Sequence, residues 1–415
     1  MNVFGNIFLK RRKMFKNKFL KLYIGVLFLV TLSFSSCEKE IPIWYSNGLK
    51  TAFYQLKEAA LEYAPSKEFP RALHKDGSIR FEPAKGWTSG FFPGNLWLMY
   101  GMSHNNEFKI VAEQYSELLD GQQYETFTHD VGFKMFCSLG TSLRYTENKK
   151  YQKDLVAAAN SLKSRYNSEI GVIRSWDFGE WQYPVIVDNL MNLELLFWAS
   201  KYTNDEIYKK IAITHAETTI KNHFRKDYSS FHVVEYDTIT AKPISKETFQ
   251  GYSDSSSWAR GQAWALYGFT MAYKETNKKE FLDQAENIAA YIIPQLKKNK
   301  DKIPFWDFSS PDIPNTVRDA SAGAIIASAF LELQKFSDKG ALYVQHAEEI
   351  LKSLSSKQYL AEKGTNKLFI LKHSTGSLPH DSEVDVPIIY ADYYYLEAME
   401  RYGKIKNIDM KQIFN

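Results

Sequence analysis

Two kinds of segment alternate along most of this chain, and this alternation is the strongest constraint on its fold. One kind is amphipathic, with apolar residues spaced near 3.6, and the other is apolar almost throughout. Six pairs predict six helical hairpins that close into an all-α (α/α)6 barrel with the apolar helices inside; an open α-solenoid is the alternative. We expect amphipathic helices at 48–63, 106–119, 149–165, 205–223, 278–297 and 340–355, apolar helices at 90–102, 131–145, 186–201, 257–274, 319–335 and 387–402, and a short strand at 230–236.

Similar turns join several apolar segments to the amphipathic segments that follow them. Each turn has a polar residue, then charged residues and an aromatic residue, and the copies begin at Ser103, Thr146, Thr203 and Thr276. Ser and Thr favour the position just before a helix, because their hydroxyl oxygen accepts a free backbone N–H there. We therefore expect these four residues to be helix N-caps.

No linker rich in Pro, Gly or Ser interrupts residues 45–405, so residues 48–415 are expected to form one catalytic barrel domain. Hydrophobic residues make up 44% of the chain and aromatic residues 15%, which argues against extensive disorder. Two cysteines, Cys37 and Cys137, are too few for a disulfide framework or a Cys-rich metal site. Cys137 lies within an apolar segment, and we expect it in the core.

The N-terminus has the order of a secretory signal, with basic residues at 10–21, an apolar stretch at 22–32, and then small residues. The apolar stretch is short for a membrane-spanning helix. Ser35, Ser36 and Cys37 resemble a bacterial lipoprotein lipobox, in which Cys37 would become the first mature residue and carry the lipid. We expect a lipoprotein signal peptide at 1–36 and a tether at 37–47. The protein would then be exported and lipid-anchored, facing the periplasm or the cell exterior; an ordinary signal peptide with a chance cysteine is the alternative.

The net charge of +4 comes from this N-terminal segment. Residues 1–36 hold seven basic residues and no acidic one, so removing them from the total of 52 leaves 45 basic residues against 48 acidic. The basicity therefore belongs to the export signal and does not indicate a nucleic-acid-binding surface.

Aromatic residues and carboxylates gather at the starts of the six apolar helices, which face one rim in a closed barrel. This combination suits a carbohydrate, because aromatic faces stack on sugar rings while carboxylates and amides bind hydroxyls. Asp130 and Asp188 each open an apolar helix, where unequal surroundings can divide a pair into a protonated acid and an ionised partner. The alternative is that both are helix caps, which is how we interpret Asp319.

Signatures of other chemistries are missing from the sequence. It has no phosphate-binding or dinucleotide-binding glycine motif, no G-x-S-x-G nucleophile motif and no clustered histidines at metal-ligand spacing. No metal or organic cofactor is implied. His215 and His223 lie on an amphipathic helix, and we interpret them as surface or packing residues.

Five stretches of the sequence together resemble glycoside hydrolase family 88, the unsaturated glucuronyl hydrolases, and the resemblance runs from about residue 45 to 402. They are WTSGFFPG at 87–94, HDVGF at 129–133, VDNLMNLELL at 187–196, TFQGYSDSSSWARGQAWALYG at 248–268 and SEVDVPIIYADYYYLEA at 382–398. The family fold is an (α/α)6 barrel, in agreement with the number of hairpins.

The resemblance implies an activity on oligosaccharides left by polysaccharide lyases, which carry a 4,5-unsaturated uronic acid at the non-reducing end. An acid protonates C4 of the enol ether while water adds at C5, and the glycosidic bond then breaks. One carboxyl that gives a proton and regains one from water suffices for this step. The resemblance gives this role to Asp188 and a supporting role to Asp130, with Asn189 beside the sugar ring.

The resemblance also implies the contacts that hold the sugar. It assigns pocket-lining aromatic rings to Trp87, Trp176 and Trp264, and polar contacts to His232, Gln250 and Arg260. Arg260 suits an anionic sugar because its guanidinium is planar and permanently charged. We expect Trp176 to be an exposed loop residue. The expected substrates are unsaturated disaccharides from chondroitin, hyaluronan or heparin-type glycosaminoglycans, and the expected membrane contact is through the lipid alone.

Three other functions remain open at this point. An unsaturated rhamnogalacturonyl hydrolase would use related chemistry on pectin fragments. A non-catalytic glycan-binding lipoprotein would have the same site without activity. An ordinary inverting glycosidase would hold two carboxylates about 6.5–9.5 Å apart with a water between them and would cleave saturated substrates.

Overall fold

A computed structural model describes residues 40–63 and 66–414 of this protein. The expected signal peptide and the lipidation site at Cys37 lie outside the described residues. Residues from Pro42 to Asn415 form one compact unit. Its first helix, α2 (Ile43–Tyr63), begins earlier than expected, so residues 43–47, which we had assigned to the tether, are helical. The ring of Tyr45 is buried against Tyr402, which explains why the helix extends back this far.

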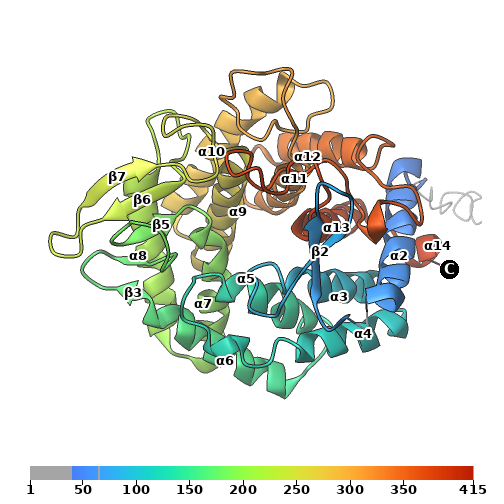
Figure 1. The fold of residues 1–415 in the computed structure, drawn as a ribbon, viewed down its shortest axis with the longest axis horizontal. Coiled ribbons are helices and arrows are strands. Elements are labelled where there is room, and N and C mark those ends of the chain that lie inside the picture. The colour runs from blue at the N-terminus through green and yellow to red at the C-terminus, as the bar shows by residue number, and fades with distance from the viewer. Residues whose placement is uncertain (1–39, 64–65, 415) are drawn as a thin grey trace, which may run out of the picture. The chain divides into compact units, whose positions relative to one another are not determined.

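Within residues 40–63 and 66–414, six inner helical segments form a closed ring (Figure 1). Each segment contacts the next, and the last contacts the first, so the closed barrel is confirmed and the open solenoid is excluded. The inner segments are α3 (Phe91–Ser103), α5 (Val131–Met135) with the following π-helical turn η3 (Phe136–Gly140), α7 (Asn189–Thr203), α9 (Ala259–Thr276), α11 (Ala320–Leu333) and α13 (Ile389–Lys406).

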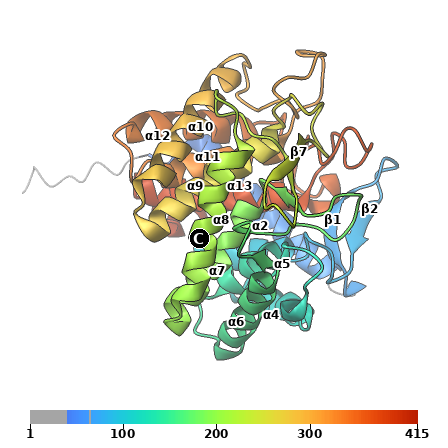
Figure 2. The same ribbon diagram turned by 90° about the vertical axis from the view of Figure 1, so that its left-hand side faces the viewer.

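In the part of the chain that the structure describes, six outer helices surround this ring, each packed on an inner segment (Figure 2). They are α2, α4 (Asn106–Glu117), α6 (Lys149–Ser164), α8 (Glu206–His223), α10 (Lys279–Lys297) and α12 (Gly340–Leu354). The sequence pattern explains the two layers. Every residue of α11 is buried, whereas α10 buries a stripe that includes Phe281, Ala285, Ile288 and Ile292. A short C-terminal helix, α14 (Lys411–Phe414), packs on α2.

The expected N-caps were wrong by two residues. The caps are the side chains of Asn105, Asn148 and Asp205, each of which accepts the N–H of the residue two positions later. The hydroxyl of Ser103 instead donates to a carbonyl of the preceding helix and accepts the N–H of Asn105, and Thr203 and Thr276 do the same in their turns. Ser and Thr thus end the inner helices, and an Asn or Asp starts three of the outer helices.

Short strands occupy the loops that lead into the inner helices. Strands β1 (Phe69–Leu73) and β2 (Ile79–Glu82) form a hairpin before α3, and β3 (Tyr166–Asn167) pairs with β4 (Val172–Ile173). A three-stranded antiparallel sheet has the order β5 (Pro184–Ile186), β6 (Val233–Tyr236) and β7 (Pro243–Glu247), and β6 is the expected short strand. In the described part of the chain, no helix combines the length and apolarity needed to cross a membrane.

Candidate active site

The three-stranded sheet brings three predicted site residues together. Ile186 on β5 pairs with Val233 on β6, and Val233 pairs with Glu247 on β7. Asp188 follows β5, His232 precedes β6 and Gln250 follows β7. Because the strands are antiparallel, all three residues lie at the same end of the sheet. The N–H of Val187 donates to the carbonyl of His232 at 3.0 Å and extends the ladder up to the site.

The hydrogen bonds of His232 define its protonation. Its Nδ1 lies 3.1 and 3.2 Å from the backbone N–H groups of Phe249 and Gln250, so it must accept from them and carry no proton. Burial lowers the pKa of His232 to about 3, so the ring is neutral at physiological pH. The proton is therefore on Nε2, which lies 3.7 Å from Oδ2 of Asp188. His232 presents a fixed N–H donor beside the carboxyl group.

Asp188 stands at the start of α7 and is 8% exposed. Burial raises its pKa to about 7, and the nearby charge of Asp130 acts in the same direction. Arg260 and a hydrogen bond from Trp264 oppose this rise. Among the described residues, no hydrogen-bond partner reaches the buried Oδ2 atom. Asp188 can therefore hold or release a proton near neutral pH, which is what a group that acts as acid and base requires.

Asp130 is held in place from both sides of its carboxylate. Thr128 donates to its Oδ2 at 2.6 Å, and Nε2 of His129 lies 3.3 Å from its Oδ1. The helix that follows Asp130 is tied to α7, because the N–H of Phe133 donates to Oδ1 of Asn192 at 2.8 Å. This link sets the spacing between the start of α5, where Asp130 lies, and the start of α7, where Asp188 lies.

The predicted aromatic residues form two groups. The rings of Trp87 and Trp264 both pack against Phe133 inside the rim, and Trp87 is half-buried while Trp264 is 1% exposed. Trp176 is 7% exposed, so the expectation of an exposed loop residue was wrong. Phe178 stacks on Trp176 at 4.8 Å between ring centroids and covers it.

Arg260 is held in place by contacts within the protein, and its expected contact with the sugar stays a prediction. Its guanidinium is almost fully buried and is hydrogen-bonded to Asp319 at 2.6 Å and to the carbonyls of Thr375 and Gly376. These bonds hold the loop at 373–380 over the rim, and Nε2 of Gln250 donates to the same Gly376 carbonyl. Asp319 also caps α11 by accepting from Ser321, which confirms its structural interpretation.

Asn189 lies beneath the site. It is fully buried, and its side chain donates to the carbonyl of Ile173 on β4 at 2.8 Å. The structure thus shows Asn189 fixing the start of α7 against the neighbouring hairpin. Asp130, Asp188, His232, Gln250 and the two tryptophans Trp87 and Trp264 are brought together at one end of the barrel.

Sequence analysis missed two aromatic contributors. The ring of Tyr390, at the start of α13, lies 5.1 Å from that of Trp87, and Phe249 lies 5.3 Å from Trp176 and 4.3 Å from His380. Both lie within the stretches that carry the family resemblance, and Phe249 directly precedes Gln250. Their position at the start of an inner helix and beside Gln250 could have indicated them. In the described residues, no three His, Cys, Asp or Glu side chains are grouped to hold a metal ion.

Comparisons with known proteins agree with this geometry. A sequence model of Glycosyl Hydrolase Family 88 matches residues 65–405. The unsaturated glucuronyl hydrolase of Formosa agariphila is 45% identical over 340 residues, which cover 81% of this chain and 85% of that protein. The unsaturated chondroitin disaccharide hydrolase of Streptococcus pneumoniae is 33% identical over 361 residues, which cover 85% of this chain and 90% of that protein.

Solved structures give the same result. The crystal structure of an unsaturated glucuronyl hydrolase specific for heparin matches with a TM-score of 0.87 and 51% identity, covering 89% of this chain and 99% of that one. The unsaturated glucuronyl hydrolase of Bacillus sp. GL1 matches with a TM-score of 0.81 and 26% identity, covering 86% of this chain and 96% of that one. From its sequence, its barrel and the residues at its rim, this chain belongs to glycosyl hydrolase family 88.

Proposed function

We propose that Asp188 is the acid and base of an unsaturated glucuronyl hydrolase, which removes the 4,5-unsaturated uronic acid from the non-reducing end of lyase-generated glycosaminoglycan fragments. The observation that carries the assignment is the state of Asp188. It is a buried carboxyl with a pKa of about 7, beside the neutral His232, and its Oδ2 has no hydrogen-bond partner among the described residues.

The reaction follows from the chemistry of an enol ether. The protonated carboxyl of Asp188 gives its proton to C4, and a water adds its oxygen to C5 as positive charge develops there. The resulting carboxylate takes the second proton of that water, which restores the acid. The C5 hemiketal then opens by breaking its bond to the ring oxygen. C5 becomes a ketone and C1 a hemiacetal, which releases the leaving sugar and becomes an aldehyde.

The other residues support this step by holding the sugar. The N–H at Nε2 of His232 can donate to a hydroxyl or carboxylate oxygen beside Asp188, and the fixed carboxylate of Asp130 can accept from a hydroxyl. The rings of Trp87 and Trp264 supply apolar faces for the first sugar. Trp176, Phe178 and Phe249 form an aromatic shelf on which the leaving sugar can stack.

We propose heparin-type fragments as the preferred substrates. The argument is similarity: identity is 51% to the structure of the hydrolase specific for heparin and 33% to the chondroitin disaccharide hydrolase of S. pneumoniae. The test compares kcat/KM for unsaturated disaccharides from heparin, chondroitin and hyaluronan digests. A higher kcat/KM for a chondroitin or hyaluronan product would overturn this preference and leave the reaction assignment intact.

The reaction is tested by loss of the ultraviolet absorbance of the conjugated double bond. The wild-type protein should abolish this absorbance, and Asp188→Asn should not. Asp338→Asn is the matched control, since Asp338 is an exposed residue in the turn before α12. Activity on a pectin-lyase product alone would favour the rhamnogalacturonyl alternative. Cleavage of saturated glycosides would favour the inverting glycosidase, and no activity on any substrate would favour a glycan-binding protein.

We also propose that the protein is exported and lipid-anchored through Cys37. The support is the order of basic, apolar and small residues before this cysteine. In a bacterial host, metabolic labelling with a fatty acid should label the wild-type protein and not Cys37→Ala. A labelled Cys37→Ala variant or an unlabelled wild-type protein would contradict the proposal.

A further inference from the structure

The end of the barrel opposite the candidate active site is formed by the turns that follow the inner helices. We call this end the turn face and define it as residues 100–110, 141–154, 200–210, 273–283, 332–342 and 400–411. The helix α2 begins at this face. The rings of Trp44 and Tyr45 lie 5.3 and 5.4 Å from that of Tyr402, which is close to the end of α13. The chain therefore enters the barrel at the end that lies away from Asp188.

The proposed lipid anchor lies close to the turn face along the chain. Cys37 is five positions before Pro42, the first residue of the compact unit. Five residues of fully extended chain span at most about 18 Å. A lipid on Cys37 would therefore keep the start of α2, and the turn face around it, close to the bilayer surface.

The net charge of the turn face is opposite in sign to that of the rest of the chain. The face holds 17 of the 45 basic residues and 12 of the 48 acidic residues after position 36, which leaves 28 basic and 36 acidic residues elsewhere. Anionic lipid surfaces attract basic side chains that can reach them. Four lysines of the face are exposed and form no ion pair with a described residue, namely Lys149, Lys153, Lys210 and Lys411.

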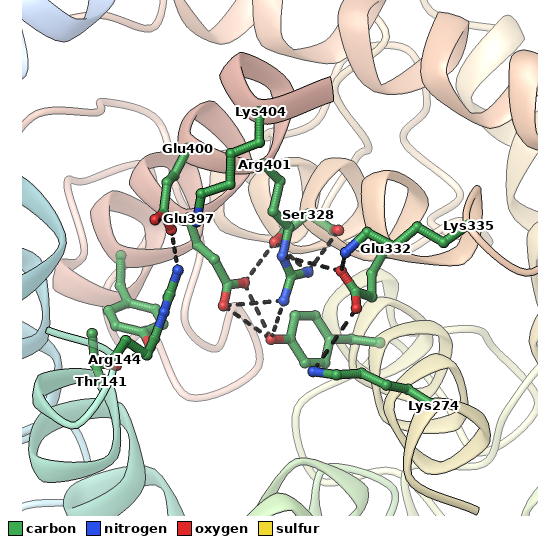
Figure 3. Close-up of polar contacts among 12 residues, drawn as sticks. Thr141, Arg144, Lys274, Ser328, Glu332, Lys335, Glu397, Glu400, Arg401 and Lys404 are labelled. Carbon is green, nitrogen blue, oxygen red and sulfur yellow. Dashed lines mark hydrogen bonds and ion pairs between the residues drawn. The ribbon is translucent and has the colours of Figure 1, made fainter. Parts of the chain in front are cut away.

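The carboxylates of the turn face do not neutralise its basic residues one by one (Figure 3). Two carboxylates are each shared by two basic side chains, so each group keeps one positive charge in excess. The groups are Glu400 with Arg144 and Lys404, and Glu332 with Lys274 and Lys335. A cavity of about 670 Å3 extends from this face into the barrel, and Cys137, which we had expected in the core, is half-buried and lines it.

Large apolar side chains are exposed among these lysines. Ile43, at the start of α2, is 77% exposed. The turn face adds Ile110, Tyr202, Ile207 and Leu342, which are 40–55% exposed. Lysines mixed with single apolar side chains suit the surface of a bilayer, where the ammonium groups meet phosphates and the apolar groups enter the interface. An anionic polysaccharide would contact the lysines but would offer no apolar layer to the other side chains.

We propose that the turn face docks on a membrane surface of anionic lipids, so that the rim with Asp188 points away from the membrane. The inference rests on the proposed lipid anchor for bringing this face to the bilayer, and it does not depend on the hydrolase activity. The lysines and the exposed apolar side chains give the face an affinity for anionic lipid that does not require the lipid on Cys37.

Co-sedimentation with vesicles at low salt tests this affinity on residues 40–415, which contain the whole compact unit and lack the lipidation site. Vesicles that contain phosphatidylglycerol should bind about tenfold or more tightly than vesicles of phosphatidylcholine alone, although the net charge of the protein is negative. Replacing two turn-face lysines, Lys149→Glu with Lys210→Glu, should weaken this binding by about tenfold or more.

The matched control is Lys226→Glu with Lys242→Glu. It makes the same change in net charge at two exposed lysines outside the turn face, so the loss should stay within about threefold. Equal binding to the two kinds of vesicle, no binding to either, or equal losses in the two double variants would each overturn the proposal. Binding of heparin fragments at Lys149 and Lys210 without vesicle binding would also overturn it and assign the face to a polysaccharide.

The orientation is tested on the full chain, isolated from bacterial membranes and reconstituted in the same vesicles. A fluorophore on Ile207→Cys, at the turn face, should be quenched by a lipid with a nitroxide headgroup, and one on Phe127→Cys, near the rim, should not. Both variants also carry Cys137→Ser, which removes the half-buried thiol. Stronger quenching at position 127 would overturn the orientation. A protein that binds anionic vesicles but takes up no fatty acid would contradict the proposed anchor alone.

Discussion

At the level of single residues, the unusual group is Asp188, whose pKa of about 7 comes from its burial. An acid that must protonate carbon is active only while it carries the proton. We therefore expect kcat to fall about tenfold per pH unit well above pH 7. His232 has a pKa of about 3 and should add no step above pH 4. The measurement is the pH–rate profile with an unsaturated disaccharide. A flat profile from pH 6 to 9 would contradict the role of Asp188.

The same pKa has a cost in stability. The folded protein binds a proton at Asp188 between pH 3.8 and about 7, whereas the unfolded chain releases it. The contribution of Asp188 to the free energy of unfolding is therefore fully present below pH 3.8 and is lost as the pH rises through about 7. Asp188→Asn has no charge to bury, so it should be more stable than the wild type at pH 8, by up to about 4 kcal/mol. Urea unfolding at pH 8 and pH 4 measures this, and the difference should vanish at pH 4.

At the level of secondary-structure elements, the contact between α5 and α7 positions the two carboxylates. Gly132 makes this contact, since a Cβ there would lie 2.4 Å from Oδ1 of Asn192 and 2.7 Å from its Cα. Gly132→Ala should push the two segments apart and cost about 2 kcal/mol of stability. It should also lower kcat, because Asp130 and Asp188 start these segments. Urea unfolding and kinetics measure both effects.

Gly323→Ala is the matched control for Gly132→Ala, because it lies on the inner helix α11. Its added Cβ would meet the end of the Ile303 side chain at 3.3 Å, and that side chain can move. It should leave both stability and kcat close to the wild type, since alanine favours a helix. Equal effects of the two substitutions would mean that the contact between α5 and α7 has no special role.

At the level of the whole molecule, stability in acid depends on buried histidines. Burial lowers the pKa values of His129, His215, His223 and His232, so the unfolded chain binds more protons than the folded one below pH 6.5. The contribution of these histidines to the free energy of unfolding is fully present above pH 6.5 and is lost as the pH falls. Asp188 and Asp392, with raised pKa values, act in the opposite direction.

His223 isolates this effect, because neither ring nitrogen has a hydrogen-bond partner among the described residues. His223→Leu should reduce the loss of stability below pH 6.5 by about 1.4 kcal/mol per pH unit, the contribution of one proton. The measurement is urea unfolding between pH 6.5 and 4.5. His74→Gln is the control for replacing a histidine, since His74 is exposed. An unchanged slope in His223→Leu would contradict the assignment.

The sequence by itself determined the fold class and the location of the site. Local hydrophobic periodicity predicts the two kinds of helix without any knowledge of distant contacts. The twelve predicted segments agree with the described helices within a few residues. Asp130, Asp188 and their aromatic neighbours could be found because they start apolar helices, which must face one rim in a closed ring.

Only the tertiary structure decided the chemistry of the individual groups. The pKa of Asp188 and the tautomer of His232 depend on burial and on backbone donors from another strand. Arg260, which is expected to bind the sugar, is fixed by Asp319 and by a loop more than 100 residues away. Cys137 lines a cavity because α5 and η3 border an incompletely filled barrel end. Such properties arise from contacts between residues far apart in the chain, and local sequence patterns do not encode them.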